Sequence, residues 1–489
     1  MKHKIVIMLT VAMACIGVLA GCGTSANGKD EFSKLEGNGK DYLVSDSEVN
    51  KNSLIKDKSI AMLGSSSLNG YASQGEALAE YMETVYSCKV TKAVAEDDAT
   101  MTTVGEDTYI QHMKDDLNSE SGYDMLLCQI PVQDSDKGVA LGNISTDKNI
   151  ENQDTDTIIG AMEYIINYAQ NTWECPVFFY TNSLYNNEAY GKITDEFTGL
   201  KAKYPYIGIC NMWAKDGKYI VFNGITDDER ELYAYDDIHL TQAGYREWWG
   251  PKLGRELDSF ARKLYADGNS EDYDMAKLSK MEQSPLDGKN ICALGSSVTY
   301  GEASFQQAVG EYLAARCGAA LTKEAVSGTT LADVNDTSYV SRMEDNLDTS
   351  ADFDLFVVQL STNDASQGID LGEISNSTEL SSFDTQTVTG AIEYIINYVN
   401  QTWGCPVAFY TGTQYDSEDY AKMVQQILAL KEKYSNLIVL DLFSDDEFNN
   451  ISEEDRALYM SDPIHPTRAG YREWWGPELE KQLLTALEM

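Results

Sequence analysis

The chain has 489 residues, enough for two or three domains, and its formal net charge is −41. A field this negative repels nucleic acid and anionic lipid head groups, so neither is an expected partner. The nine cysteines form no Cys-x-x-Cys pair and no metal-ligand spacing with histidine. We therefore expect neither a disulfide scaffold nor a structural metal, and no motif indicates a cofactor.

The N-terminus is typical of an exported protein. Lys2 and Lys4 precede an apolar run that falls short of the ~20 residues of a membrane-spanning helix. The run ends in Leu-Ala-Gly-Cys, which resembles the lipobox of bacterial lipoproteins. We expect 1–21 to be a cleaved signal peptide and Cys22 to be lipidated, so that a lipid anchor alone holds the protein outside the cytoplasm, at the cell surface. The polar stretch 22–57 is then expected to be a flexible tether.

Long segments of the first half recur, in the same order, in the second half. Gly-Ala-Met-Glu-Tyr-Ile-Ile-Asn-Tyr at 160–168 returns at 390–398 with a single change. Because the two copies of this segment stand nearly half the chain apart, the repeat indicates tandem duplication of a whole domain, not a short-period solenoid. We place the two domains at 58–266 and 289–489, joined by a polar linker at 267–288 with Ser-Pro and Asp-Gly turn signals.

Within the second copy, short apolar runs alternate with helical patterns. The runs that predict buried strands are 290–294, 354–360, 406–410 and 437–442. The patterns that predict amphipathic helices are 305–316, 388–402, 420–434 and 472–487. This alternation predicts an α/β fold with helices on both faces of a parallel sheet, so we expect two tandem three-layer α/β/α domains. Ligands of such sheets bind beyond the carboxyl ends of the strands.

Three residues of the second copy predict a serine hydrolase. Ser297 follows the first predicted strand, and Asp462 and His465 lie close together near the C-terminus. A serine hydroxyl becomes a nucleophile only when a base takes its proton, and this copy has one histidine. Asp462 can hold that imidazole in the productive tautomer and stabilise its cation. Gly-Ser-Ser alone is also typical of an ordinary strand-to-helix turn, so the prediction depends on all three residues together.

Four short blocks of the second copy occur in the order that marks a known family. Ser297 lies in Gly-Ser-Ser, Gly328 in Ala-Val-Ser-Gly, Asn363 in Ser-Thr-Asn-Asp, and His465 in Asp-Pro-Ile-His. This set resembles the blocks of the SGNH (GDSL-type) hydrolases, which are esterases and lipases with a flavodoxin-like α/β/α fold. The resemblance implies an ester hydrolase that forms an acyl-serine intermediate without metal or cofactor. Ser297, His465 and Asp462 would be its catalytic residues.

The resemblance also implies an oxyanion hole made by the backbone N–H groups of Ser297 and Gly328 and the side-chain amide of Asn363. Each donor of this kind typically contributes ~10²–10³-fold in rate. The sequence departs from the family pattern at Ser296, where Asp is frequent, and at Ser361, where Gly is frequent. Neither position supplies the chemistry, so the departures concern the shape of the pocket.

The first copy repeats the nucleophile, the carboxylate and the base as Ser66, Asp236 and His239. Its oxyanion donors differ. Aligned without gaps, Glu96 stands at the place of the family glycine, and Gln133 stands at the place of the asparagine.

A carboxylate at position 96 would lie beside the developing oxyanion and raise the barrier. The longer side chain of Gln133 would displace its amide, and a misplacement of about 1 Å can cost ~10²-fold. We therefore predict that the first copy is weakly active or inactive. In an alternative alignment, Gly105 supplies the missing donor after a local shift.

The expected substrate is an acylated small molecule or polysaccharide, such as an O-acetylated carbohydrate, because a tethered, exported enzyme meets polymers outside the cell. A lipase or lysophospholipase is disfavoured because the sequence shows no apolar lid pattern. A non-catalytic surface lipoprotein that binds a glycan or a protein stays open, since duplicated and partly degenerate domains also suit that function. The sequence leaves the oligomeric state open.

Overall fold

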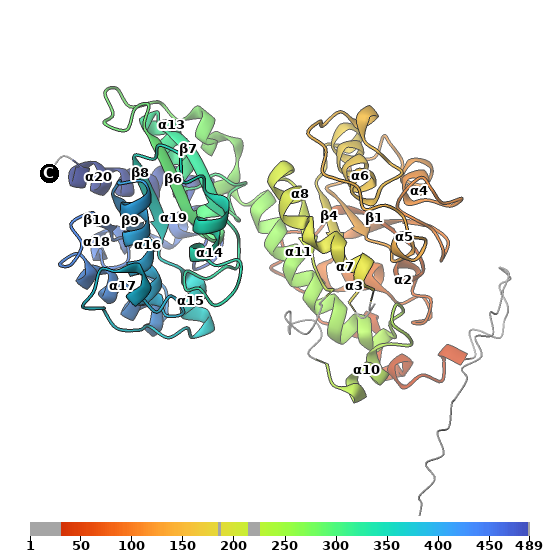
Figure 1. The fold of residues 1–489 in the computed structure, drawn as a ribbon. Coiled ribbons are helices and arrows are strands. Elements are labelled where there is room, and N and C mark those ends of the chain that lie inside the picture. Colours follow the sequence, from red (N-terminus) through yellow and green to blue (C-terminus); the bar gives the residue numbers. More distant parts are fainter. Residues whose placement is uncertain (1–30, 184–186, 214–224, 488–489) are drawn as a thin grey trace, which may run out of the picture.

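The computed structural model describes residues 31–183, 187–213 and 225–487, which fold around two five-stranded parallel sheets (Figure 1). Their strand orders, β2-β1-β3-β4-β5 and β7-β6-β8-β9-β10, are the same when the second sheet is followed from β7. Helices cover both faces of each sheet. The predicted α/β/α fold is therefore confirmed for both halves of the chain, called here the first and the second domain.

The first domain is built on β1 (Ser59–Gly64), β2 (Lys89–Val94), β3 (Met125–Gln129), β4 (Val177–Tyr180) and β5 (Gly208–Cys210). Its helices are α2 (Ser66–Asn69), α3 (Leu78–Tyr86), α4 (Tyr109–Asp115), α5 (Gln133–Asp136), α6 (Ile158–Trp173), α7 (Glu188–Asp195), α8 (Phe197–Lys203), α10 (Asp227–Tyr233), a π-helix at Gly244–Trp249 and α11 (Gly250–Tyr265). Side chains of β1 alternate between two apolar layers. Ala61 and Leu63 pack into one layer, and Ile60 and Met62 pack into the other.

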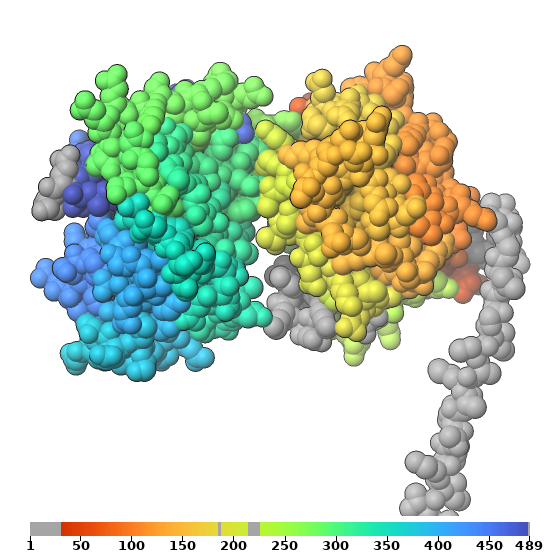
Figure 2. Space-filling view, turned by 45° about the horizontal axis from the view of Figure 1, so that its top comes forward, coloured from red at the N-terminus to blue at the C-terminus, as the bar shows by residue number. Residues whose placement is uncertain are grey.

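The second domain is built on β6 (Asn290–Gly295), β7 (Ala320–Ala325), β8 (Leu355–Gln359), β9 (Val407–Tyr410) and β10 (Leu437–Leu440). Its helices are α12 (Ser297–Tyr300), α13 (Val309–Cys317), α14 (Tyr339–Asn346), α15 (Thr362–Gln367), α16 (Val388–Thr402), α17 (Glu418–Leu430), α18 (Asp446–Asn449), α19 (Glu453–Tyr459), a π-helix at Gly470–Trp475 and α20 (Gly476–Leu487). Figure 2 shows the two domains in contact along one side.

The sequence predicted four strands of the second domain to within two residues at each end, but it missed β7. This strand lies at the edge of the sheet beside β6, and its residues are exposed or half-buried, so it has no apolar run. The helix predicted from 305 begins at Val309, because Phe305 and Gln306 have positive φ angles of 54° and 62°. These two residues form a tight turn before α13.

The prediction of a flexible tether is wrong for residues 31–57. They form three short 3₁₀ turns, at Glu36–Asn38, Lys40–Tyr42 and Val44–Asp46. Val44 and Ile55 are fully buried in the first domain. A few apolar side chains in this otherwise polar stretch are therefore sufficient to hold it against the first domain. The predicted signal peptide at 1–21 and Cys22 lie outside the described residues. Within the described part, no helix has both the length and the apolarity needed to cross a membrane.

The predicted linker, residues 267–288, packs on the second domain in the same way. Its 3₁₀ turns lie at Asp267–Asn269, Glu271–Tyr273 and Met275–Lys277, and Met275 and Leu286 are buried. One asparagine fixes each segment. Asn38 donates to the carbonyls of Phe32 and Ala72 at 2.8 and 2.7 Å. Asn269 donates to the carbonyls of Lys263 and Ala303 at 2.9 and 2.7 Å. Phe32 and Lys263 are therefore equivalent positions of the two domains.

Two candidate active sites

The structure places the three residues predicted to act in the second domain within hydrogen-bond distance of one another. His465 Nε2 lies 2.8 Å from Ser297 Oγ, and His465 Nδ1 lies 2.8 Å from Asp462 Oδ2. Ser297 begins α12 directly after β6, whereas Asp462 and His465 lie in the loop that follows α19. This is the geometry of a serine nucleophile, a base and an orienting carboxylate.

The loop itself holds Asp462 in position. Its Oδ1 accepts the backbone N–H groups of Ile464 and His465 at 2.8 and 2.9 Å. Burial alone would raise the pKa of Asp462, but the hydrogen bond and charge interaction with His465 and the two backbone donors keep that pKa below its ordinary value. The carboxylate therefore stays ionised at neutral pH, as stabilisation of an imidazolium requires.

A buried glutamine that the sequence analysis did not identify fixes the turn that carries Ser297. Gln359 ends β8, and its Oε1 accepts the backbone N–H groups of Ser296 and Thr299 at 3.0 and 3.1 Å. It also accepts the Thr299 hydroxyl at 3.1 Å. These bonds join the nucleophile turn to the centre of the sheet. No sequence signal marks this glutamine, because its function depends on pairing across strands.

Of the two remaining predicted oxyanion donors, Gly328 lies in the loop after β7 and Asn363 lies in the first turn of α15. Gly328 has a φ angle of +83°, a left-handed conformation that favours glycine, although there is free space where a Cβ would stand. The Asn363 amide donates to the carbonyl of Thr329 at 2.9 Å, and its second N–H is not used in this bond. Buried Arg342 supports the same loop by donating to Thr329 Oγ1 at 3.1 Å and to the carbonyl of Gly295 at 2.8 Å.

The first domain contains an equally complete set of nucleophile, base and carboxylate. His239 Nε2 lies 2.9 Å from Ser66 Oγ, and His239 Nδ1 lies 2.8 Å from Asp236 Oδ2. Burial opposes ionisation of Asp236, but its hydrogen bonds with the side chain and the backbone of His239 keep its pKa below the ordinary value. The difference between the domains lies elsewhere in the sites.

The oxyanion loop of the first domain is built differently, and the ungapped alignment of that loop needs a correction. Gly64 pairs with Val94 as Gly295 pairs with Ala325, so Glu96 is equivalent to Ser327, one position before Gly328. The error arose because the Ala-Val dipeptides at 93–94 and 325–326 were matched to each other, one residue out of step with the strands.

No residue of this first-domain loop reproduces the glycine donor. The backbone N–H of Glu96 donates to Asp107 at 2.8 Å and is therefore already used. Neither Glu96 nor Asp97 has the positive φ angle of the family glycine. Gly105, the alternative donor, also lacks it, and a Cβ there would lie 2.4 Å from the Thr100 hydroxyl. Gln133 does contact the loop, since its amide donates to the carbonyl of Asp97 at 2.5 Å.

The walls beside the two histidines also differ in chemistry. In the first domain the Tyr71 ring lies 4.7 Å from the His239 ring. Phe32 packs edge-on against Tyr71 and Tyr235, each at 5.1 Å. Tyr71 and Tyr235 are 47% and 41% exposed, so they present aromatic surface next to the triad.

In the second domain, polar groups occupy the equivalent wall, and part of it comes from the first domain. Lys201 of α8 and Lys263 of α11 line a cavity of about 130 Å³ together with Glu302, Asp462 and His465. Lys201 Nζ lies 3.3 Å from the Glu302 carboxylate. Burial opposes ionisation of Glu302, but the charges of the two lysines lower its pKa to about 2. Glu302 in turn accepts the Ser327 hydroxyl at 2.7 Å, directly beside the oxyanion loop.

Part of the chain is similar to proteins already known. Residues 293–473 match the model of the GDSL-like Lipase/Acylhydrolase family. No curated protein matches the chain. One similar solved structure is a Lactobacillus plantarum protein, 20% identical over 42% of this chain and 98% of that chain, with a TM-score of 0.32. A candidate GDSL-like lipase from Bacteroides ovatus is 18% identical over 41% of this chain and 99% of that one, with a TM-score of 0.31.

A family two carbohydrate esterase from Clostridium thermocellum, solved with cellohexaose, is 14% identical over 42% of this chain and 66% of its own, with a TM-score of 0.29. The matched family region, 293–473, contains Ser297, Gly328, Asn363 and the loop with Asp462 and His465. The match to the GDSL-like lipase/acylhydrolase model therefore lies within the second domain and spans the residues predicted to act there.

Proposed function

We propose that the protein is a serine ester hydrolase that removes acyl groups, such as O-acetyl groups, from carbohydrates outside the cell. The observation that carries the proposal is the continuous hydrogen-bonded series from Ser297 through His465 to Asp462, with both contacts at 2.8 Å, beside a loop with a positive-φ glycine. Such a series activates a hydroxyl, and such a loop can present N–H groups to an oxyanion.

The reaction follows from this geometry. His465 takes the proton of Ser297 while Oγ bonds to the ester carbonyl carbon, and the negative charge on the carbonyl oxygen is met by the N–H groups of Ser297, Gly328 and Asn363. The tetrahedral intermediate collapses, and the alcohol leaves with the proton from His465. A water molecule then attacks the acyl-serine with His465 again as base, which releases the carboxylic acid and restores the serine hydroxyl.

The charged wall of the second site favours a small, polar ester over a lipid. A long acyl chain placed beside Lys263 and Glu302 would remove water from buried charges without offering them hydrogen bonds, which is costly. A sugar hydroxyl can replace that water. This argument disfavours the lipase and lysophospholipase alternatives.

A fluorophosphonate probe tests the proposal. We expect one covalent adduct on Ser297, located by mass spectrometry of the full chain, and no adduct there in Ser297→Ala. Acetate release from acetylated xylan should then exceed fatty-acid release from a long-chain phospholipid. A chain that takes up no probe and releases no acetate would instead be the non-catalytic binding protein.

The cellular location is part of the same proposal. We propose that cleavage before Cys22 and lipidation of this cysteine tether the enzyme at the cell surface, where polymers are accessible. The support is the basic, apolar and small-residue pattern of 1–22. Metabolic labelling with an alkyne-bearing fatty acid should mark the protein in its native host, and Cys22→Ala should abolish the label. Labelling that persists in the variant would contradict the predicted anchor.

A further inference from the structure

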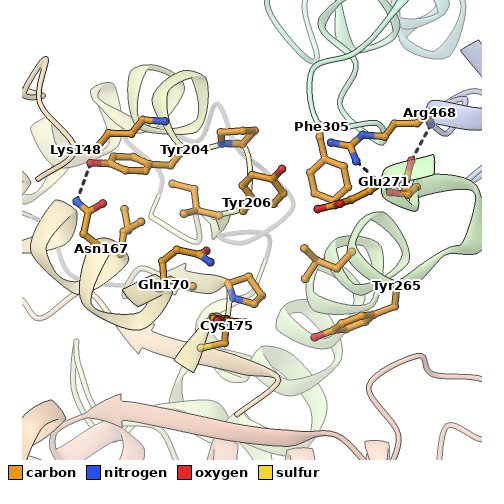
Figure 3. Close-up of a pocket in the computed structure, with 18 of the residues that line it drawn as sticks. Lys148, Asn167, Gln170, Cys175, Tyr204, Tyr206, Tyr265, Glu271, Phe305 and Arg468 are labelled. Atoms are coloured by element: carbon orange, nitrogen blue, oxygen red, sulfur yellow. Dashed lines mark hydrogen bonds between the residues drawn. The ribbon is translucent and has the colours of Figure 1, made fainter. Parts of the chain in front are cut away.

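We propose that the cleft between the two domains binds a neutral oligosaccharide and presents its acylated unit to Ser297. This inference rests on the proposed function and adds a binding site to which both domains contribute. The cleft has a volume of about 660 Å³, within the range of roughly 300–1,000 Å³ typical of ligand sites. Tyr204 and Tyr206 line it from the first domain, and Phe305 and Arg468 line it from the second (Figure 3).

The cleft adjoins the catalytic loop of the second domain. Ile207 lines both this cleft and the 130 Å³ cavity that contains Asp462 and His465. Consecutive residues of α11 also divide between the two spaces, with Lys263 in the small cavity and Leu264 in the large cleft. A chain of sugar units in the cleft would therefore extend toward the base that activates Ser297.

The aromatic residues suit the faces of sugar rings. Tyr206 is 49% exposed although its ring lies 5.0 Å from Phe305, at an interplanar angle of 38°. One side of the Tyr206 ring is thus supported by the second domain while much of the residue stays open. Figure 3 shows Tyr204 and Tyr265 around the same space. The C–H groups of a pyranose face pack well on such rings, and the hydroxyl of the exposed Tyr206 offers a polar contact.

The polar residues favour a neutral ligand. The positive charges of Lys148 and Arg468 are matched by the negative charges of Glu174 and Glu271, so the lining carries no formal net charge. A nucleotide or another strongly anionic ligand would find no excess of positive charge here, within a protein whose net charge is −41. The exposed amide of Gln170 adds a donor and an acceptor of the kind that sugar hydroxyls use.

The clearest polar anchor for a ligand in the cleft is Arg468. Lys263 lines the adjoining small cavity, and its ammonium lies 5.3 Å from the centre of the Phe305 ring. Arg468 is 4% exposed, and its Nε finds no acceptor in the described structure. Buried donors are normally paired. The hydroxyl and ring oxygens of a bound sugar would provide the acceptors.

The test measures binding separately from turnover. The full-length Ser297→Ala protein is titrated by calorimetry with hexamers of β-1,4-linked glucose, xylose and mannose, none of them acylated. We expect at least one hexamer to bind, and Tyr206→Ala in the same background to weaken that binding on the order of tenfold. Gln170→Ala, on the exposed face of α6, should weaken it less. Tyr235→Ala is the matched control, because this tyrosine is 41% exposed beside the first triad. It should leave binding unchanged.

Two results would overturn the inference. One is the absence of binding for all three hexamers, and the other is binding that Tyr235→Ala abolishes while Tyr206→Ala leaves it intact. Hydrolysis of a small aryl acetate separates this inference from the proposed function. With Ser297 present, Tyr206→Ala should lower the turnover of an acetylated oligosaccharide more than that of the aryl acetate, because so small an ester does not reach the cleft. If the unaltered chain hydrolyses no ester, the proposed function fails independently of the binding result.

Discussion

The two candidate sites share their catalytic distances and differ in nearly everything around them. The serine–histidine contact is 2.9 Å in the first domain and 2.8 Å in the second, and both histidine–carboxylate contacts are 2.8 Å. Among the described residues, only the second site has a positive-φ glycine in the loop after its edge strand, and the wall beside it is charged where the first is aromatic. A well-formed triad is thus insufficient to assign activity, because the oxyanion must also be stabilised.

Removal of each nucleophile should show the largest contrast between the domains. We expect Ser297→Ala to lower the turnover of an aryl acetate by about 10³-fold or more, because no other group forms the acyl intermediate. Ser66→Ala should change the turnover less than twofold. Steady-state rates of the two full-length variants provide the comparison. Equal losses would show that the first domain is an active hydrolase and that its oxyanion loop works without the glycine.

Removal of each amide donor should give a smaller contrast of the same kind. Asn363→Ala should reduce kcat about 10²-fold and leave KM nearly unchanged, because the amide acts on charge that develops only in the transition state. Gln133→Ala should have no measurable effect on the same reaction. If Asn363→Ala instead raises KM at constant kcat, this amide holds the substrate and does not stabilise the oxyanion.

The ion pairs that support the oxyanion loop also differ between the two domains, and we expect the difference to appear in the free energy of unfolding. Arg342 is buried and pairs with Glu324 at 3.0 Å, so Arg342→Met leaves a carboxylate without its partner and should cost about 3 kcal/mol of unfolding free energy. His112, on the equivalent helix of the first domain, pairs with Asp107 and Asp116 nearer the surface. His112→Ala should cost less than about 1 kcal/mol in the same denaturant titration. Similar losses would contradict this difference in support.

The sequence predicted the features that depend on local patterns. Four strands of the second sheet are nearly continuous in apolar residues, and the triad lies in motifs with a fixed order, so both were found. β7 was missed because an edge strand with exposed residues shows no such run. The oxyanion loop of the first domain was placed one residue out of register, because two short Ala-Val dipeptides were matched and the pairing of the strands, which fixes the register, is not visible in the sequence.

Other features depend on contacts between distant segments. Gln359 fixes the nucleophile turn from a neighbouring strand, and its residue type alone indicates nothing. Lys263 belongs to the last helix of the first domain, yet it lines a cavity with the base of the second. Residues 31–57 resemble a tether in composition, but a few buried apolar side chains dock them on the first domain. These three features result from tertiary packing, which no single segment of the sequence encodes, so the sequence analysis did not predict them.

The smallest expected effect concerns the position where the walls of the two sites diverge, Glu302 in the second domain and Tyr71 in the first. The pKa of Glu302 falls from its ordinary value of 4.5 to about 2, so the unfolded chain binds its proton more readily than the folded chain does. The resulting stabilisation is fully present above pH ~4.5 and is lost as the pH falls toward about 2. Thermal unfolding from pH 7 to pH 3 should therefore show Glu302→Gln less stable at neutral pH, with the difference narrowing in acid, whereas Tyr71→Phe should show no such trend. A Glu302→Gln deficit that stays constant with pH would mean that this carboxylate contributes shape to the wall of the second site and that its charge does not join the domains.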